Sequence, residues 1–206
     1  MEKTKIYLYG ASSHSKVILD ILESNNLVIN GYFDDNNLID FYNGYEVEHN
    51  ASKLNNISRI FIVSIGNNKN RKLIVEKLQT KFIKAIHSSA QLSPSTKIGE
   101  GSVIMANVSI NSSSSLGKHT IVNTNASVDH DCFIGDYVHL SPNVALAGNV
   151  KVGEGTHIGI GSCVIQGITI GKWVIIGAGA VIINDIPDYA VVVGNPGRVI
   201  KYNYEK

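Results

Sequence analysis

Aliphatic side chains recur at every sixth position between residues 92 and 182. The positions of this series are Leu92, Ile98, Ile104, Ile110, Leu116, Val122, Val128, Ile134, Leu140, Leu146, Val152, Ile158, Val164, Ile170, Ile176 and Ile182. All sixteen carry Ile, Leu or Val, and the series never slips in phase. Such a run is very improbable by chance, even if these residue types filled about a quarter of all positions. A hexapeptide period predicts a β-helix in which each aliphatic side chain points inward.

Small residues and glycines repeat in step with this series. Four positions after an aliphatic residue stand Ser102, Thr120, Ala126, Cys132, Thr156, Ser162 and Ala180. Glycine directly follows the aliphatic residue at Gly99, Gly117, Gly135, Gly153, Gly159, Gly171 and Gly177. We expect glycine to relieve the backbone where one flat strand bends sharply into the next. Three hexapeptides close one triangular coil, so residues 18 apart stack at about 4.8 Å and the series makes about five coils.

The first 88 residues follow a different pattern, in which short apolar runs alternate with helical periodicity. This pattern predicts strands at 5–10, 28–33, 57–65 and 82–86, and helices at 16–22 and 71–79. Alternation of strand and helix is typical of a parallel α/β unit, here a small Rossmann-like domain. We therefore expect two domains, 1–88 and 89–206, joined by a linker at Ser88–Pro94. After residue 186 the sixfold pattern ends, and a strand and turn over 191–198 precede a polar tail.

Three predicted strands of the first domain end in polar or small residues. The loop at 10–15, the pair Asp34-Asp35 and the segment Gly66–Asn68 should converge, because ligands of parallel sheets bind at the carboxyl ends of the strands. Loop amides at a helix N-terminus suit a phosphate, and a carboxylate about 20 residues later suits a ribose hydroxyl. This predicts a nucleotide or nucleotide-sugar site, and the alternative is an ordinary turn with solvated carboxylates. Only Gly10 of the three-glycine dinucleotide fingerprint is present, which disfavours a nicotinamide cofactor.

Composition excludes several classes of function. Of 206 residues, 44% are hydrophobic and 17% are charged, with a formal net charge of +1, so no basic excess suggests nucleic acid. We expect no signal peptide at residues 1–4 and no membrane span, hence a cytoplasmic protein. Cys132 and Cys163 are interpreted as small buried residues and not as a disulfide. They are 31 positions apart, which is not a multiple of 18, so they are not stacked neighbours.

Four histidines fall within the predicted coils. His139 and His157 are 18 apart and should stack, and His130 should stack beneath Gly148. A glycine there leaves room for a thioester, and its N–H could act as an oxyanion donor. Asp131 could orient the His130 imidazole and raise its basicity if adjacent side chains converge at a corner of the coil.

Simpler interpretations stand beside this one. A histidine in a repeat is often a solvated surface residue, which is the favoured interpretation for His119 and His157 and an even alternative for His139. A zinc site would need three converging histidines, and neither the spacing nor the first domain favours it. Cysteine as an acyl-carrying nucleophile is disfavoured, because we expect both cysteines in the small inward position of a repeat.

A set of motifs in order along the chain resembles a known family. These are residues 7–15, Phe33-Asp34-Asp35, 65–68, 128–132, Ala147–Val150 and Gly194-Asn195-Pro196. The chain is similar over essentially its whole length to nucleotide-sugar N-acetyltransferases that act on 4-amino-4,6-dideoxyhexoses, of which the bacillosamine-pathway enzymes are the nearest type and sialic acid O-acetyltransferases are relatives. The resemblance implies a left-handed parallel β-helix and a homotrimer that binds acetyl-coenzyme A between neighbouring β-helices, with active sites between subunits.

The resemblance also implies roles for individual residues. His130 would be the general base, oriented by Asp131 in place of the glutamate that is commoner in bacillosamine enzymes. The nucleotide would be held by Ser12, Ser13, His14, Asp34, Asp35, Gly66 and Asn67. The acetyl-CoA side would comprise His139, Gly148, His157, Gly159 and Gly177, with the Gly148 amide facing the thioester carbonyl. Ser13 and Ser15 stand where the family often has glycine, which could reshape the phosphate loop and the choice of nucleotide.

The predicted reaction is acetyl-CoA-dependent N-acetylation of the 4-amino group of a UDP- or dTDP-linked 4-amino-4,6-dideoxyhexose, for surface glycan biosynthesis. The amine would attack the thioester directly while His130 takes its proton, and no metal is implied. Acetylation of a hydroxyl group of sialic acid or a related glycan is the alternative, since a hydroxyl acceptor needs a base just as much. A non-catalytic β-helix scaffold or nucleotide sensor is a third.

Overall fold

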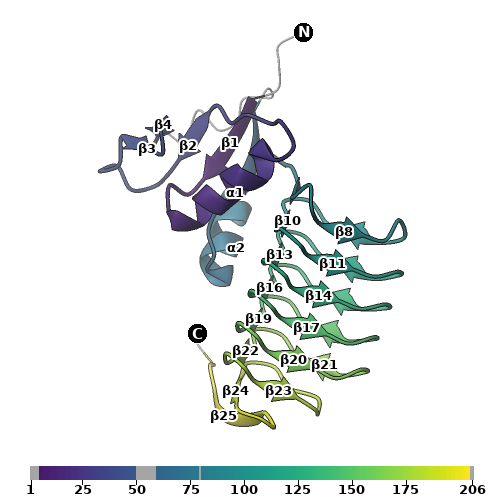
Figure 1. The fold of residues 1–206 in the computed structure, drawn as a ribbon. Helices are drawn as coiled ribbons and strands as arrows, with labels where there is room; N and C mark the ends of the chain where they lie inside the picture. Colours follow the sequence, from purple (N-terminus) through teal and green to yellow (C-terminus); the bar gives the residue numbers. More distant parts are fainter. Residues whose placement is uncertain (1–4, 50–58, 79, 205–206) are drawn as a thin grey trace.

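The structure is a computed structural model that describes residues 5–49, 59–78 and 80–204. A small α/β layer lies beside the upper part of a ladder of coils, and the last two strands close the lower end (Figure 1). The expectations for residues 1–4, for positions 57 and 58 of the third strand and for Gln79 of the second helix lie outside the described residues.

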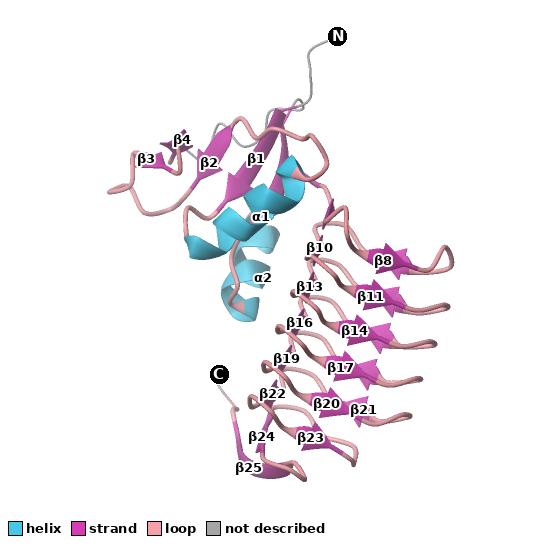
Figure 2. Cartoon of the chain, in the orientation of Figure 1, coloured by secondary structure: helices cyan, strands magenta, loops and turns pink. Residues whose placement is uncertain are grey.

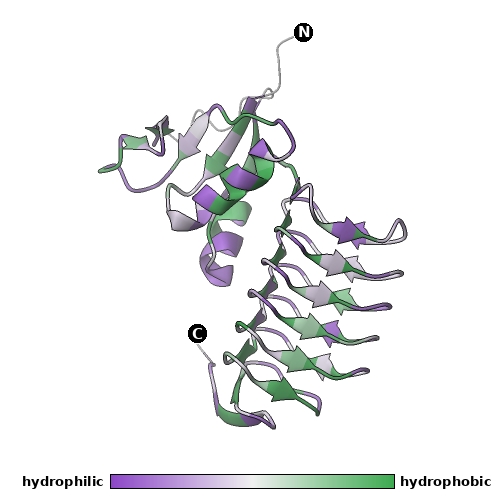
Figure 3. Ribbon diagram, in the orientation of Figure 1, coloured by the Kyte–Doolittle hydropathy of each residue, from purple (hydrophilic) through white to green (hydrophobic). Residues whose placement is uncertain are grey.

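The first part is a six-stranded sheet with strand order β3-β4-β2-β1-β5-β6. Its elements are β1 (Lys5–Tyr9), α1 (Ser13–Glu23), β2 (Gly31–Phe33), β3 (Phe41–Tyr42), β4 (Tyr45–Glu48), β5 (Arg59–Val63), α2 (Asn68–Lys77) and β6 (Lys81–Phe82). Strand β1 pairs in parallel with both β2 and β5, as the alternation of strand and helix predicts. Helix α1 is amphipathic and buries Ile18, Leu19 and Leu22, whereas α2 is largely polar (Figures 2 and 3).

Two features of this part differ from the prediction. The hairpin β3–β4 was not predicted, although its turn is an Asn43-Gly44 pair with φ of 48° and 84°, a strong hairpin signal. The expected strand over 82–86 is divided, because β6 pairs with β5 while β7 (Ala85–Ile86) pairs with β10 of the coils. The chain thus passes to the coils between Phe82 and Ala85, and the segment expected as a linker, Ser88–Pro94, already contains a coil strand.

The coils are a left-handed parallel β-helix with three faces of two-residue strands. The first face contains β7, β10 (Val103–Ile104), β13 (Ile121–Val122), β16 (His139–Leu140), β19 (His157–Ile158), β22 (Ile175–Ile176) and β24 (Ala190–Val193). The second contains β8 (Gln91–Leu92), β11 (Ser109–Ile110), β14 (Ser127–Val128), β17 (Ala145–Leu146), β20 (Cys163–Val164) and β23 (Val181–Ile182). The third contains β9 (Lys97–Ile98), β12 (Ser115–Leu116), β15 (Phe133–Ile134), β18 (Lys151–Val152) and β21 (Thr169–Ile170).

The predicted register is confirmed. Strand partners are 18 residues apart, as in Ile104 with Val122 and Val128 with Leu146. From Ile104 onward every member of the aliphatic series is buried in one core, and Leu92 and Ile98 pack partly buried at its upper end. The small residues four positions later are buried as well, with hydroxyls bonded within the coil, as in Thr156 Oγ1 to the Gly171 carbonyl at 2.7 Å.

Close backbone approach accounts for the glycines that follow the aliphatic residues. A Cβ at Gly135 would lie 2.7 Å from the amide nitrogen of Glu154 in the next coil, and one at Gly153 would lie 2.6 Å from the Gly171 backbone. Neither glycine has a positive φ. The reason for glycine is therefore the tight stacking of one bend on the next.

The lower end of the coils departs from the prediction. Strand β24 continues the first face, and β25 (Arg198–Tyr202) folds back against it in antiparallel pairing. The residues expected as a polar tail thus form a strand. Asn203 follows β25 and lies near Tyr189, whose carbonyl accepts its backbone N–H at 2.8 Å.

Candidate active site

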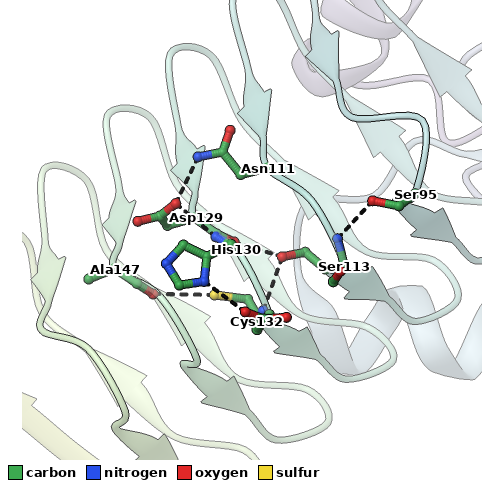
Figure 4. A network of polar contacts seen from close by, with 9 residues as sticks. Ser95, Asn111, Ser113, Asp129, His130, Cys132 and Ala147 are labelled. Atoms are coloured by element: carbon green, nitrogen blue, oxygen red, sulfur yellow. Dashed lines mark hydrogen bonds and ion pairs between the residues drawn. The ribbon is translucent and has the colours of Figure 1, made fainter.

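His130 and Asp131 converge at the corner between the second and third faces. Asp131 has φ of 59°, and this left-handed corner turns two adjacent side chains toward each other. His130 Nδ1 lies 2.8 Å from Asp131 Oδ2. The His130 ring projects from this corner beside Asp129 and Cys132 (Figure 4). The predicted convergence at a corner is therefore present.

The surroundings of this pair favour the protonated imidazole. The hydrogen bond with Asp131 raises the pKa of His130 above its ordinary value, and the negative charge of Asp129 adds to the effect. Asp129 is itself fixed, because its Oδ1 accepts from Asn111 Nδ2 at 2.7 Å and from the His130 backbone N–H at 2.8 Å. His130 is thus an oriented and strengthened base whose side chain is 57% exposed.

Gly148 lies one coil away and faces the His130 ring. A Cβ at Gly148 would lie 2.7 Å from Cε1 and 2.8 Å from Nε2 of that ring. Nδ1 is engaged by Asp131, so Nε2 is the nitrogen turned toward Gly148. The hydrogen bonds among the described residues do not use the Gly148 N–H as a donor. The corner therefore places an oriented imidazole against a bare backbone whose amide is unused by the described residues.

The two cysteines differ. Cys132 is buried as expected, its Sγ lies 3.3 Å from the Ala147 carbonyl, and burial raises the pKa of its thiol, which disfavours the thiolate. Cys163 is exposed, so the expectation of a second buried cysteine is wrong. It occupies the outward position of β20, one residue before the inward Val164.

The loop after β1 leaves the start of α1 open. Ser12 is the N-cap residue but makes no side-chain cap, and Ser12 and Ser13 are exposed. The amides of the first turn of α1 can therefore receive an anion such as a phosphate. His14 points elsewhere: it is half-buried, with its ring centroid 6.4 Å from that of His139.

The two carboxylates after β2 have separate functions. Asp34 is used within the protein, because Oδ2 accepts the Ala11 N–H at 2.7 Å and Oδ1 accepts the Asn36 N–H at 2.8 Å. Asp35 is more exposed, and its Oδ1 accepts from Tyr9 Oη at 2.8 Å and from Lys77 Nζ at 3.1 Å. Asp34 therefore fixes the loop, and Asp35 is the carboxylate better placed to meet a ligand.

A cleft of about 690 Å³ opens between the start of α2 and the first face of the coils. Its lining residues are Gly66, Asn67, Asn68, Lys69, His139, Gly155, His157, Trp173, Ile175, Tyr189 and Asn203. The Asn67 side chain caps α2 by accepting the Asn70 N–H at 3.0 Å. The cleft brings together Gly66 and Asn67, predicted for the nucleotide, with His139 and His157, predicted for acetyl-CoA.

The imidazoles beside this cleft are neutral. His139 and His157 stack with ring centroids 4.9 Å apart, as predicted from their spacing. Burial lowers the pKa of His139 to about 3 and that of His14 to about 4, and it also lowers the pKa of His157. His157 Nε2 lies 2.8 Å from Ser141 Oγ, and His139 Nε2 lies 3.2 Å from Asn123 Nδ2. Neutral rings can exchange hydrogen bonds with a bound ligand without adding charge.

His119 is not the solvated residue that the repeat suggests. It is 2% exposed, stacks on Tyr137 at 5.5 Å and meets the edge of Phe82 at 4.6 Å. Helix α2 covers this corner, and burial lowers the pKa of His119 to about 4.

The predicted residues do not form a single site within one chain. His130, Asp131 and Gly148 lie at the corner between the second and third faces, whereas the cleft lies on the first face, beside α2. Gly159 and Gly177 stack on each other at the corner between the first and second faces and do not line the cleft. Trp173, Tyr189 and Asn203 also line the cleft and were not predicted from sequence, although Trp173 is the single tryptophan of the chain and was the most visible signal.

Two further observations concern the described part of the chain. No group of three or more His, Cys, Asp or Glu side chains there is arranged to hold a metal ion. None of its helices combines the length and the apolar character needed to cross a membrane.

Known proteins resemble this chain in sequence and in structure. A family model described as the PglD N-terminal domain matches residues 5–78. A mutant of perosamine N-acetyltransferase from Caulobacter crescentus, solved with CoA and GDP-perosamine, is 35% identical with a TM-score of 0.92, and the match covers 96% of this chain and 97% of that one. The chain belongs to the nucleotide-sugar N-acetyltransferases of the hexapeptide-repeat superfamily. The acetyltransferase domain of PglB from Neisseria gonorrhoeae, solved with acetyl coenzyme A, shares this architecture at 38% identity and a TM-score of 0.88, covering 96% and 100% of the two chains.

Curated sequences match this chain over shorter stretches. UDP-N-acetylbacillosamine N-acetyltransferase from Bacillus subtilis is 48% identical over 50 residues, which is 23% of each chain. The chain spans less than a quarter of the length of the curated relatives it matches, 21% and 23%. Nucleotide-sugar N-acetyltransferase membership therefore rests on the structural relatives, which are covered almost completely.

Proposed function

We propose that this protein transfers the acetyl group of acetyl-CoA to the amino group of a nucleotide-linked 4-amino-4,6-dideoxyhexose. The observation that carries the proposal is the His130–Asp131 pair facing the bare backbone of Gly148, in a chain that matches an N-acetyltransferase of an amino-sugar nucleotide over 96% of its length. Acetyl-CoA is the expected donor, because related structures hold CoA or acetyl coenzyme A. UDP, dTDP and GDP are the nucleotides to be compared.

The chemistry follows from the two nitrogens of His130. Asp131 holds Nδ1, which leaves Nε2 as the atom that takes a proton from the attacking amine. The amine nitrogen bonds to the thioester carbonyl carbon, and the carbon–sulfur bond breaks. The proton on Nε2 passes to the departing thiolate, so the products are an amide and free CoA. An alkyl ammonium has a pKa well above neutrality, so a positioned base is useful at pH 7.

The Gly148 amide is the proposed donor to the developing oxyanion. It lies in the coil next to His130 and is not engaged by the described residues. Preorganised N–H donors of this kind contribute about 10²–10³-fold to the rate in acyl transfer. The neutral side chains His139 and His157 would contact the donor or the sugar, and the start of α1 together with Asp35 would hold the nucleotide.

We further propose a homotrimer in which neighbouring subunits complete each active site. Within one chain the proposed base lies at one corner of the coil and the cleft lies on the first face. A site that needs both must take them from two copies. Closed cyclic symmetry would repeat this site identically around the oligomer.

The deciding experiment follows release of the CoA thiol with UDP-, dTDP- and GDP-linked 4-amino-4,6-dideoxyhexoses. We expect rapid release with one nucleotide class and a loss in kcat of about 10²–10⁴-fold in His130→Ala. Ser112→Ala is the matched control, because Ser112 holds the same corner position one coil earlier and is also exposed. Release with a sialic acid or another hydroxyl acceptor, and with no amine, would assign O-acetylation instead. Nucleotide binding without any transfer would indicate a sensor or scaffold.

A further inference from the structure

Arg71 is a buried cation for which the proposed reaction has no direct use. It lies in α2 and is 1% exposed, among the most buried side chains of the molecule. No carboxylate of the described residues lies within ion-pair distance of it. A buried charge is costly unless its hydrogen bonds are satisfied, so the contacts of this guanidinium indicate why it is there.

All five N–H donors of Arg71 are used. Nε donates to the His119 carbonyl at 2.9 Å, and Nη2 donates to the Tyr137 carbonyl at 2.8 Å. Nη1 donates to the carbonyls of Ile65 and Gly66 at 3.0 and 3.1 Å. Nη2 also donates to Asn68 Oδ1 at 2.9 Å. A guanidinium has five donors in a rigid fork, and this arrangement satisfies each of them with an uncharged acceptor.

The coil acceptors belong to one ladder of corners. His119, Tyr137 and Gly155 are 18 residues apart, and all three have positive φ at the corner between the third and first faces. The hydrogen bonds between coils do not use their carbonyls. Arg71 supplies donors for the first two, and Asn68 Nδ2 supplies one for Gly155 at 3.0 Å. Buried carbonyls need partners, so α2 fits this ladder in one register.

The other end of the same network is the wall of the cleft. Ile65 and Gly66 precede α2, and Gly66, Asn67 and Asn68 line the cleft opposite the first face. The Gly66 backbone also acts on His139, where it slightly offsets the lowering of the pKa. The guanidinium therefore ties the strand-end loop, the start of α2 and two coils to one another.

We propose that Arg71 is a positioning residue that holds the Gly66–Asn68 wall against the coils, so that the nucleotide-sugar side of the cleft is preformed opposite His139 and His157. Its effect on substrate rests on the proposed function. Lysine cannot replace it, because three donors on one nitrogen cannot reach both corner carbonyls and the loop. Burial is the main cause of the lowered pKa of His139, His157 and His14, and the positive charge of Arg71 adds to it.

The test compares Arg71→Lys and Arg71→Met with Lys72→Met, each shown to be folded by circular dichroism and thermal melting. Lys72 is the matched control: it also joins α2 to the coils, through Glu154 at 2.6 Å and over the Trp173 ring, but its hydrogen bond does not involve the Gly66–Asn68 segment. We expect both Arg71 variants to raise KM for the amino-sugar nucleotide by about tenfold or more, with KM for acetyl-CoA changed by less than about threefold. We expect the amides of residues 66–70 to exchange hydrogen about tenfold faster in these variants only.

Unchanged KM and unchanged exchange in folded Arg71 variants would overturn the proposal, as would an equal effect of Lys72→Met. Should neither Arg71 variant fold, Asn68→Ala removes one acceptor of the guanidinium and one corner bond while keeping the charge, and the same exchange and KM criteria apply to it. Hydrogen exchange needs no catalysis. If the wild type transfers no acetyl group to any amine, the proposed function fails, whereas the exchange comparison still decides whether Arg71 holds the wall.

Discussion

At the scale of single residues, backbone conformation decides which side chains meet. Adjacent side chains on a flat strand point to opposite faces, so a neighbouring histidine and aspartate would normally separate. The left-handed φ of Asp131 removes that alternation at the corner and brings its carboxylate to His130 Nδ1. The sixfold period places residue 131 at a corner, which is why this contact could be predicted from sequence.

The contact has a consequence for the pH dependence of the reaction. Asp131 is the main cause of the raised pKa of His130, so Asp131→Asn should lower that pKa. The base acts in its neutral form, which predominates above its pKa. The acidic limb of the pH profile of kcat/KM should therefore move to lower pH in the variant, while the plateau falls because the base is weaker and less well oriented. An acidic limb that stays in place, measured with the same substrate, would show that His130 does not control it.

Two residues show where inference from sequence stopped. Cys163 stands one position before the inward residue of its repeat, and the alternation of the strand places it outside. The expectation of a buried Cys163 was therefore wrong by one residue along the sixfold repeat, and the repeat itself already indicated the exposed position. His119 lies at an ordinary corner position, but helix α2 covers it. Arg71 of this helix, which contacts His119, comes 48 residues earlier in the chain. No local sequence pattern indicates that a helix of the other domain will bury a corner residue.

At the scale of elements, the repeat fixes contacts between coils because each residue lies on the one 18 positions before it. This register predicted the stack of His139 and His157 and the position of Gly148 beside His130. It did not predict how α2 docks. Helix α2 is mostly polar and meets the coils through donors to corner carbonyls, so the apolar periodicity that reveals ordinary helix packing is weak there.

The close contact between Gly148 and the His130 ring makes a specific prediction. Gly148→Ala should displace the His130 ring, because the new Cβ would lie within 2.8 Å of Cε1 and Nε2. We expect a large loss of kcat with a melting temperature close to that of the wild type, because His130 is exposed and can move aside. Gly161→Asn is the matched control. Residue 161 follows Asn107, Asn125 and Asn143 at intervals of 18, and all four positions have positive φ. A Cβ added at Gly161 would have no atom within 4 Å. Equal activity of the two variants would show that the space at Gly148 is not needed.

At the scale of the whole molecule, the fold separates what the chemistry must join. The α/β layer packs on the first face of the coils, and the cleft forms there because α2 stops short of the lower coils, where Trp173 and Tyr189 complete the wall. The pair His130–Asp131 points to solvent at another corner. Sequence motifs pointed to both sets of residues, but motif order alone does not say which side of a coil a residue faces; that follows from the 18-residue register.

Mixed oligomers test whether two subunits share each site. Gly66→Trp should block the cleft without disturbing the core, since a substituent at Gly66 meets only open space, and His130→Ala removes the base of the same reaction. Each variant alone should be inactive. After the two are unfolded and refolded together in equal amounts, half of the clefts are open and half of their neighbours carry His130, so about a quarter of wild-type activity should return. Simple mixing of the two folded variants, without exchange of subunits, is the control and should stay inactive. Activity that never rises above the sum of the separate variants would place the base and the cleft of each site in one chain, and would require the two groups to act without a neighbour.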